Sequence, residues 1–360
     1  MCLRSLFPAP IPRNKDSSVT PQLEYKLQGR KKANHTTRNI PNNRARDIYR
    51  MNPEATDNMT EFSIHGLSEI PELQLPIFIT ILLLYVLIIF GNVTVIAVIG
   101  GNTHLHSPMY NLLLNLSLID VAYTSNILPK LLTILLAKQK VISFVACMVQ
   151  LYFFIALASI EVIILAAMGY DRYVAICRPL HYSSLMSQKH CSMFATSAWV
   201  IGFLDPTGHI CLVSKLSFCA SHHINHFFCD LAPLLKISCS DTYKVEMFNY
   251  IVGSLLTLST FLLTLISYVF IILTILNIKS AKGRYKAFST CSSHLTCISI
   301  FYGTIICLYM RPASSYYPQQ DKFFGLLYIV LVPLLNPIIY SLKNKDFNAG
   351  IKKIMLKLTL

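Results

Sequence analysis

The segment Met168-Gly-Tyr-Asp-Arg-Tyr-Val-Ala-Ile-Cys177 ends a long apolar run, Val149 to Met168, that carries a single charged residue, Glu161. An apolar run of about 20 residues is long enough to cross a bilayer as a helix. The adjacent Asp171 and Arg172 then fall where lipid meets water. Such a pair can act as a latch, in which the carboxylate holds the guanidinium until a conformational change releases it. The alternative is a helix end whose arginine only extends to the interface.

The composition is that of an integral membrane protein. Of 360 residues, 54% are hydrophobic and 13% are charged, whereas soluble domains carry about 25% charge. Seven continuous apolar blocks predict an all-α membrane protein, a seven-helix bundle, and exclude the alternating strands of a membrane barrel. The blocks are Pro76–Ile99, Pro108–Leu128, Cys147–Tyr170, Cys191–Leu212, Tyr243–Ile275, Ala287–Tyr309 and Phe323–Leu342.

The net charge of +14 would suggest nucleic acid in a soluble protein. Here the basic residues lie in residues 1–50, in loops and in the tail, so they act as topology signals and no nucleic-acid partner is expected. The chain divides into a disordered basic extension (1–50), an extracellular amino-terminal segment (51–75), the transmembrane domain (76–342) and a cytoplasmic tail (343–360). Residues 51–75 contain no Lys or Arg, which makes Met51 a candidate natural start.

Three signals predict the orientation of the bundle. Asn58-Met-Thr60 is a glycosylation sequon just before the first block, which favours an outside amino terminus. Asn34-His-Thr36 also fits the sequon pattern, and the sequence leaves its use open. Seven spans then place the carboxyl terminus inside, together with the lysine-rich loop between the fifth and sixth blocks. The polar loop 214–242 falls outside, where disulfides form. We therefore expect a multi-pass protein of the plasma membrane.

Cysteines and buried acids mark candidate sites. Four of the eleven cysteines, Cys147, Cys219, Cys229 and Cys239, form an even set on the outer side, which is typical of a disulfide framework with three possible pairings.

Asp120 and Glu161 lie near the middle of neighbouring spans, where ionisable groups are costly. They predict a site for a cation or a shared proton, with Asn92, Asn336, Ser117 and Asn115 as candidates to complete a polar network. The alternatives are a structural hydrogen-bond cluster and the ion path of a transporter or channel. Asn336-Pro337, followed by Tyr340, predicts a kinked, movable inner end of the last helix.

Eight motifs occur in a fixed order along the chain. They are Gly91-Asn92, Leu105-His-Ser-Pro-Met-Tyr110, Asp120, the Met168–Cys177 segment, Ser267-Tyr268, Lys286-Ala-Phe-Ser-Thr-Cys-Ser-Ser-His-Leu295, Phe301-Tyr-Gly-Thr304 and Pro333-Leu-Leu-Asn-Pro-Ile-Ile-Tyr-Ser-Leu-Lys-Asn344. With these motifs, residues 52–355 resemble the rhodopsin-like (class A) G-protein-coupled receptors and, within them, the olfactory (odorant) receptors. Gly169 departs from the alanine usual there, and the extension 1–50 has no counterpart.

The resemblance implies a receptor rather than an enzyme, with disulfides Cys147–Cys229 and Cys219–Cys239. It implies that Arg172 engages a heterotrimeric G protein of the stimulatory, olfactory type, which raises cyclic AMP. The switch residues would be Asp171, Arg172, Tyr173, Tyr268, Asn336, Pro337 and Tyr340. Related receptors often hold sodium at the pair matched by Asp120 and Glu161, and no other cofactor is expected.

The same analogy places a ligand among the outer halves of the third, fifth and sixth spans. Helical spacing gathers Phe154, Ile155, Ala158 and Ser159 on one face of the third span. The other candidates are Val252, Gly253 and Leu256 on the fifth span and Tyr302 and Tyr309 on the sixth. Because none of these residues is basic, we expect a small volatile ligand that is mostly apolar and neutral.

Three other classes fit less well. A retinal-type protein needs a lysine in the last span for its Schiff base, and Phe323–Leu342 contains none. A transporter often shows inverted repeats, and none is present in the sequence. A membrane enzyme would need a metal, phosphate-loop or nucleophile motif, and the sequence has none of these.

Overall fold

The computed structural model describes residues 61–68, 70–137, 140–218, 222–309, 317–341 and 345–358, without the side chains at 286, 290, 293, 339–346 and 354–358. Some sequence predictions lie outside this part of the chain, namely those for residues 1–50 (which include Asn34), Met51, Asn58, Cys219 and the side chain of Tyr340. Within the described ranges the protein is almost entirely helical, so the predicted helical class is confirmed.

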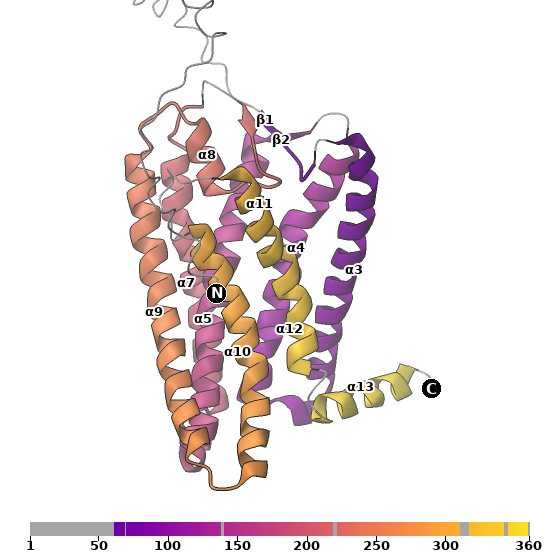
Figure 1. Cartoon of the computed structure of the whole chain (residues 1–360), viewed down its shortest axis with the longest axis vertical. Helices are drawn as coiled ribbons and strands as arrows, with labels where there is room; N and C mark the ends of the chain where they lie inside the picture. The colour runs from indigo at the N-terminus through magenta and orange to yellow at the C-terminus, as the bar shows by residue number, and fades with distance from the viewer. Residues whose placement is uncertain are drawn as a thin grey trace, which may run out of the picture. The chain divides into compact units, whose positions relative to one another are not determined.

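Seven long helical units form the described bundle (Figure 1). They are α3 (Pro71–Gly101), α4 (Pro108–Leu136), α5 (Phe144–Cys177), α7 (Gln188–Val213), α9 (Tyr243–Leu276), α10 (Ala281–Tyr309) and a composite unit. The composite unit joins α11 (Pro318–Leu326), the π-helical turn η4 (Leu327–Leu331) and α12 (Val332–Ser341). Each unit overlaps one of the seven apolar blocks of the sequence.

The helix ends differ from the ends of the apolar blocks. The first helix begins at Pro71, five residues before the first apolar block at Pro76. Proline suits the first helical turn because its missing N–H has no intrahelical partner there. Helix α5 starts at Phe144, where the Ser143 hydroxyl caps the Ala146 amide, and runs on to Cys177. The helices differ from the blocks because a block is bounded by the first and last apolar residues. A helix instead begins and ends where caps and turns satisfy its terminal N–H and C=O groups.

Short elements cover the two ends of the bundle. At one end, β1 (Glu61–Ile64) pairs antiparallel with β2 (Val141–Ser143) and parallel with β3 (His223–Ile224), and α8 (Leu231–Ile237) follows β3. At the other end lie η1 (Thr103–Leu105), η2 (Pro179–His181), α6 (Tyr182–Leu185) and α13 (Lys345–Leu358), so the predicted tail 343–360 is largely helical.

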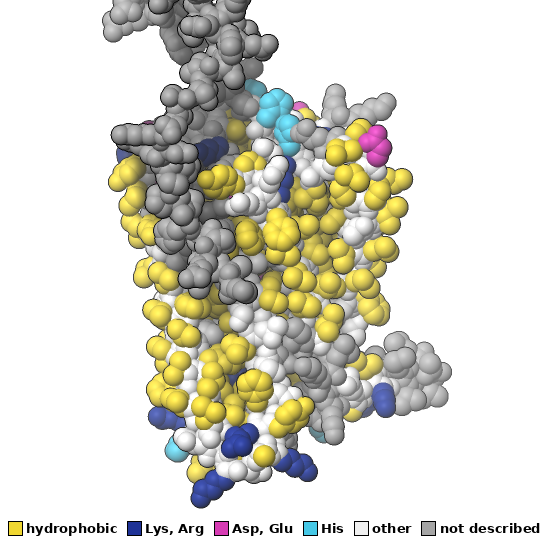
Figure 2. Space-filling view, viewed as in Figure 1, with side chains coloured by type: hydrophobic (Ala, Val, Ile, Leu, Met, Phe, Trp, Pro, Cys, Tyr) yellow, Lys and Arg dark blue, Asp and Glu magenta, His cyan; other side chains and the backbone are white. Residues whose placement is uncertain are grey.

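Five described helical units are long and apolar enough to cross a membrane: α3, α4, α5, α9 and the stretch Pro318–Ile338. Helix α10 adds a sixth if its parts Ala281–Ser289 and His294–Tyr309, bent by 42°, count as one span. Helix α7 has sufficient length, but Lys189, Asp205 and His209 make it less apolar. Hydrophobic side chains cover the visible sides of the bundle (Figure 2), as expected for a surface that faces lipid.

Helix α5 lies at the centre of the bundle, packed against α4, α7 and α9. In its most apolar stretch 61% is buried, against 28% for α3 at the periphery. One continuous apolar core joins these helices to α10 and the composite unit, and a smaller cluster packs beneath the sheet around Cys147 and Phe62. Helix α5 is therefore the helix that makes the most extensive packing contacts in the described bundle.

Gly202 marks the close approach of α7 to α5. A Cβ atom there would lie 2.9 Å from the carbonyl oxygen of Ala156 and would overlap Ile160. We expect Gly202→Ala to lower the free energy of unfolding by about 1–3 kcal/mol, measured as a lower melting temperature of the purified protein in detergent. Gly303→Ala is the control, because its Cβ would meet no described atom within 4 Å. Equal melting temperatures for the two variants would contradict the expectation.

Candidate functional site

Helix α5 carries three functional features along its length. Cys147 stands near its first turn, Glu161 and the cavity residues lie in the middle, and Asp171 and Arg172 stand near its end. From Cys147 to Arg172 the helix rises about 38 Å, the thickness of a bilayer with part of its interfaces. One rigid element thus connects the disulfide end of the bundle to the Arg172 end.

The disulfide end is fixed by covalent and hydrogen bonds. Cys147 and Cys229 form a disulfide with Cα atoms 5.4 Å apart. The Gln150 side chain accepts a hydrogen bond from the Cys229 amide at 2.9 Å and donates to the Asn126 carbonyl at 2.9 Å. Cys239 is also disulfide-bonded, and Cys219, its predicted partner, is outside the described residues. The loop after α7 is therefore held onto the start of α5.

A cavity of about 100 Å³ lies between α5, α7, α9 and α10. Seven of the nine predicted ligand residues line it: Phe154, Ile155, Ala158, Ser159, Gly253, Leu256 and Tyr309. Residues that the sequence prediction did not include are Val162, Asp205, His209, Asp230, Leu231, Asn249, Ser254, Thr257, Ile305 and Tyr328. A cavity therefore lies where the sequence analysis expected the ligand. The polar side chains that line this cavity come mostly from α7, α8 and α9.

Two predicted pocket residues do not line this cavity. Tyr302 shares a helix face with Tyr309, but seven residues correspond to about 10.5 Å along the axis. The Tyr302 ring is buried farther along α10 than Tyr309, and its centre lies 5.2 Å from the centre of the Phe261 ring. On α9 the lining residues Asn249, Gly253, Leu256 and Thr257 follow the spacing of one helix face, and Val252 stands beside that face.

Asp205 on α7 is an acid within a helix of the bundle that the sequence analysis did not single out beside Asp120 and Glu161. Its Oδ2 atom accepts a hydrogen bond from Ser159 at 2.6 Å, and its carbonyl oxygen lies 3.2 Å from Nδ1 of His209. Across the cavity, Asp230 accepts a hydrogen bond from the Leu231 amide at 2.7 Å and from the Tyr309 hydroxyl at 3.5 Å. An ionisable side chain within a membrane span is costly and therefore marks a candidate site. This criterion applies to Asp205 as well, so the sequence alone could have identified it.

Below the cavity lies a polar core between α3, α4, α5 and the composite unit. Asn336 donates to both carboxylate oxygens of Asp120, at 3.3 and 3.0 Å, and Tyr328 donates to Glu161 at 3.0 Å. Asn92 bridges α3 to α12 through the carbonyl oxygens of Ile88 and Pro333, each at 3.0 Å.

Asn115, by contrast, accepts a hydrogen bond from Trp199 at 2.8 Å, and no hydrogen bond joins it to the polar core among the described residues. Ser117 is buried, and none of the described groups bonds to its hydroxyl. Within the described residues, Asn92 Oδ1, Glu161 Oε1 and Asn336 Oδ1 have no hydrogen-bond partner. The polar core thus offers side-chain oxygens without a hydrogen-bond donor in the described part of the chain, and oxygen is the ligand that alkali cations prefer.

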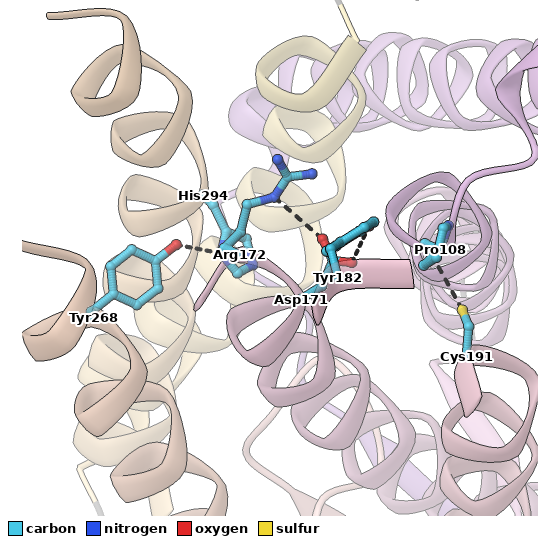
Figure 3. A network of polar contacts seen from close by, with 7 residues as sticks. All are labelled: Pro108, Asp171, Arg172, Tyr182, Cys191, Tyr268 and His294. Carbon is cyan, nitrogen blue, oxygen red and sulfur yellow. Dashed lines mark hydrogen bonds and ion pairs between the residues drawn. The ribbon is translucent and has the colours of Figure 1, made fainter. Parts of the chain in front are cut away.

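Two pairs of side chains flank Arg172 at the other end of α5 (Figure 3). On one side, Asp171 lies 3.7 Å from Nε of Arg172 and accepts a hydrogen bond from the Tyr182 hydroxyl at 2.8 Å. On the other side, the Tyr268 hydroxyl pairs with Nδ1 of His294 and links α9 to α10. Asp171 is only 1% exposed, whereas the Arg172 side chain is 20% exposed. A protein that binds this end of the bundle can therefore contact the arginine.

Tyr182 and His294 join the predicted switch residues, although the sequence prediction gave neither of them a role. Burial and the nearby carboxylate of Asp171 raise the pKa of the Tyr182 hydroxyl, which therefore stays protonated and donates. Tyr173 packs beside Phe270 of α9, with ring centres 5.9 Å apart. Pro337 packs against α3, where a Cβ on Gly91 would lie 3.1 Å from its ring.

The histidines around β3 do not assemble a metal centre. Among the described residues, no group of three or more His, Cys, Asp or Glu is placed to hold a metal ion. His226 is instead buried and stacked on Phe227, with ring centres 4.8 Å apart. Its burial, with the positive charge of Lys322, lowers the pKa of His226 to about 3, so the imidazole is neutral at physiological pH.

Comparison with known proteins identifies the kind of molecule that carries this arrangement. A family model described as olfactory receptor matches residues 81–358. Olfactory receptor 5AR1 of Mus musculus is 47% identical over 307 residues, which cover 85% of this chain and 99% of that protein. The Homo sapiens protein of the same name is 45% identical with the same coverage, and Homo sapiens olfactory receptor 5B21 is 45% identical over 305 residues (85% and 98%).

The apolar helices and the family match define an integral membrane receptor of the G-protein-coupled class, not an enzyme. The chain belongs to the olfactory receptor family, which confirms the resemblance drawn from the sequence motifs.

Proposed function

We propose that this receptor binds a small, mostly apolar volatile in the cavity beside α5 and activates a stimulatory, olfactory-type G protein, raising cyclic AMP. The observation that carries the proposal is the continuity of α5, which lines the cavity with Phe154 and Ser159 and presents Arg172 about four helical turns or more farther on. In this proposal the amino terminus is extracellular, the Arg172 end is cytoplasmic and the receptor acts in the plasma membrane.

The two pairs beside Arg172 provide the switch. In the described state Asp171 holds the guanidinium and is itself held by Tyr182. The Tyr268–His294 pair keeps α9 and α10 together. Ligand pressure on α5, α9 and α10 would separate these helices at the Arg172 end and turn Arg172 toward the G protein. Tyr268 would leave His294 and support the released arginine, and Asn336, Pro337 and Tyr340 would allow the last helix to move.

The polar core fits a sodium ion. Asp120 and Glu161 would supply negative charge, and the side-chain oxygens of Asn92 and Asn336 could complete the coordination. A bound sodium would neutralise acids that face no basic side chain among their described hydrogen-bond partners, and would favour the inactive packing of the helices.

We expect the melting temperature of the purified receptor to be higher in sodium chloride than in choline chloride of equal ionic strength. At a sodium concentration about tenfold above the dissociation constant, binding adds about 1.4 kcal/mol to the unfolding free energy. Asp120→Asn removes one negative ligand and should abolish the difference between the two salts. A wild-type receptor with equal melting temperatures in both salts would show that the site holds a proton or a plain hydrogen-bond network instead.

A cyclic AMP reporter assay tests the proposed function. Cells would express the full chain or the form that starts at Met51, with a surface tag, and receive a broad panel of volatiles. We expect agonists that raise cyclic AMP at equal surface expression in at least one form. Ligand-driven current or uptake without cyclic AMP would instead support a channel or transporter that uses Asp120 and Glu161.

A further inference from the structure

The polar end of the cavity is lined by hydrogen-bond acceptors. The Asp205 carboxylate uses one oxygen for Ser159, and no described group donates to the other, Oδ1. His209 lies one helical turn farther on and is only 2% exposed. Its Nδ1 faces the Asp205 carbonyl oxygen at 3.2 Å, so Nδ1 carries the proton. The other ring nitrogen, Nε2, has no bonded partner among the described residues, and in a neutral imidazole it accepts a hydrogen bond.

These acceptors are held in place by their neighbours. The His209 ring packs edge-on against Phe248, with ring centres 4.9 Å apart. Phe248 also lies directly over Gly208, where an added Cβ would lie 2.5 Å from the nearest ring atom. Ser159, from the central helix α5, fixes the carboxylate of Asp205 through the short hydrogen bond described above. The geometry is therefore preorganised for a partner that donates hydrogen bonds.

The charges around the cavity point the same way. Asp205 is a half-buried carboxylate, and none of the described residues that line the cavity is Lys or Arg. Buried or half-buried carboxylates are costly without a positive partner. An ammonium group offers three donors, no acceptor and a positive charge, whereas an alcohol has only one donor and a carboxylate ligand would be repelled.

We propose that the cavity selects primary alkylamines, bound as ammonium ions by Asp205 and His209, with the alkyl chain against Phe154, Ile155 and Ala158. The inference rests on the proposed function, because it assigns a ligand class to the same cavity. It also replaces the neutral ligand expected from the sequence, which took no account of α7.

The test compares straight-chain amines, from butylamine to octylamine, with alcohols and carboxylates of the same chain lengths. Binding is measured as the shift in melting temperature of the purified receptor, and signalling as cyclic AMP in cells. Asp205→Asn keeps the size of the side chain and an acceptor for Ser159 but removes the charge. Asp205→Glu retains the charge. Asp241→Asn makes the same chemical change at an exposed aspartate outside the lining of the cavity.

We expect wild-type receptor to favour amines over alcohols and carboxylates in both measurements. Asp205→Asn should lower the ratio of amine to alcohol affinity at least tenfold, about 1.4 kcal/mol. Asp205→Glu should recover part of the ratio, and Asp241→Asn should leave it unchanged.

Several outcomes separate the inference from the proposed function. A wild-type receptor that responds to alcohols but not to amines, or is stabilised by none of the amines, would overturn the amine assignment. An unchanged ratio in Asp205→Asn would overturn it too. Amines that stabilise the purified receptor without raising cyclic AMP would support the assignment and contradict the proposed signalling.

Discussion

Replacement of Arg172 by alanine is expected to abolish the cyclic AMP response to every agonist, a loss of at least about a hundredfold in signal. Arg172 is the more accessible member of the ion pair, with 20% of its side chain exposed while Asp171 is buried. A charge-assisted hydrogen bond lost from an interface costs about 1.5–3 kcal/mol, and the loss is greater where the arginine anchors the contact. Agonists should still raise the melting temperature of the purified variant, because Arg172 does not line the cavity.

The matched control for this variant is Arg178→Ala. Arg178 lies on the same side of the bundle, is exposed, and forms no ion pair among the described residues. Arg178→Ala should signal at near wild-type level once surface expression is matched.

A complementary change, Asp171→Asn, removes the charge that holds Arg172 and is expected to raise cyclic AMP without agonist. A full response from Arg172→Ala would disprove the assigned role.

Removal of the Cys147–Cys229 disulfide is expected to prevent delivery of the receptor to the cell surface. The bond closes a loop with a sequence separation of 82 residues, for which the chain-entropy model gives a stabilisation of about 4.5 kcal/mol. Most domains have a net stability of only about 5–15 kcal/mol, so this loss is severe. We expect Cys147→Ala to reduce surface labelling of intact cells to near background.

Two further variants separate the lost bond from an exposed thiol. Cys211→Ala removes a free, exposed cysteine and should leave surface labelling unchanged. The double variant Cys147→Ala with Cys229→Ala contains no orphaned partner thiol, yet should fail as completely as the single variant. Normal delivery of the double variant would attribute the defect of the single variant to the unpaired Cys229 rather than to the missing cross-link.

Periodicity predicted the residues that a single helix brings together. Ile155, Ala158 and Ser159 line the cavity because helical spacing places them on one face of α5. Tyr302 shares a helix face with Tyr309 but does not line the cavity, since a shared face does not specify depth along the helix axis. Asp205 was missed because only two acids were considered, although a charged residue within the fourth apolar block carried the same signal.

Contacts between helices required the three-dimensional structure. The bond from Tyr182 to Asp171 depends on the fold-back of the short helix α6 onto the end of α5. The pairing of Asn336 with Asp120 joins residues with a sequence separation of 216 positions. Neither distance follows from local spacing, since both depend on how whole helices pack. The motifs in the sequence marked several of these residues as important, and the structure supplies their partners.

The π-helical turn η4 fixes how many residues separate Tyr328 from Asn336, and with it the position of both side chains. Tyr328 lies within this turn and reaches Glu161, and Asn336 lies beyond it and reaches Asp120. Each residue of an α-helix turns the chain by about 100°, so the loss of one residue from 327–331 would rotate Asn336 and Pro337 away from their partners. We therefore expect this stretch to tolerate substitutions better than insertions or deletions, because only the latter rotate the residues that follow. A gap here between two related sequences would therefore indicate a rebuilt polar core rather than a shorter loop.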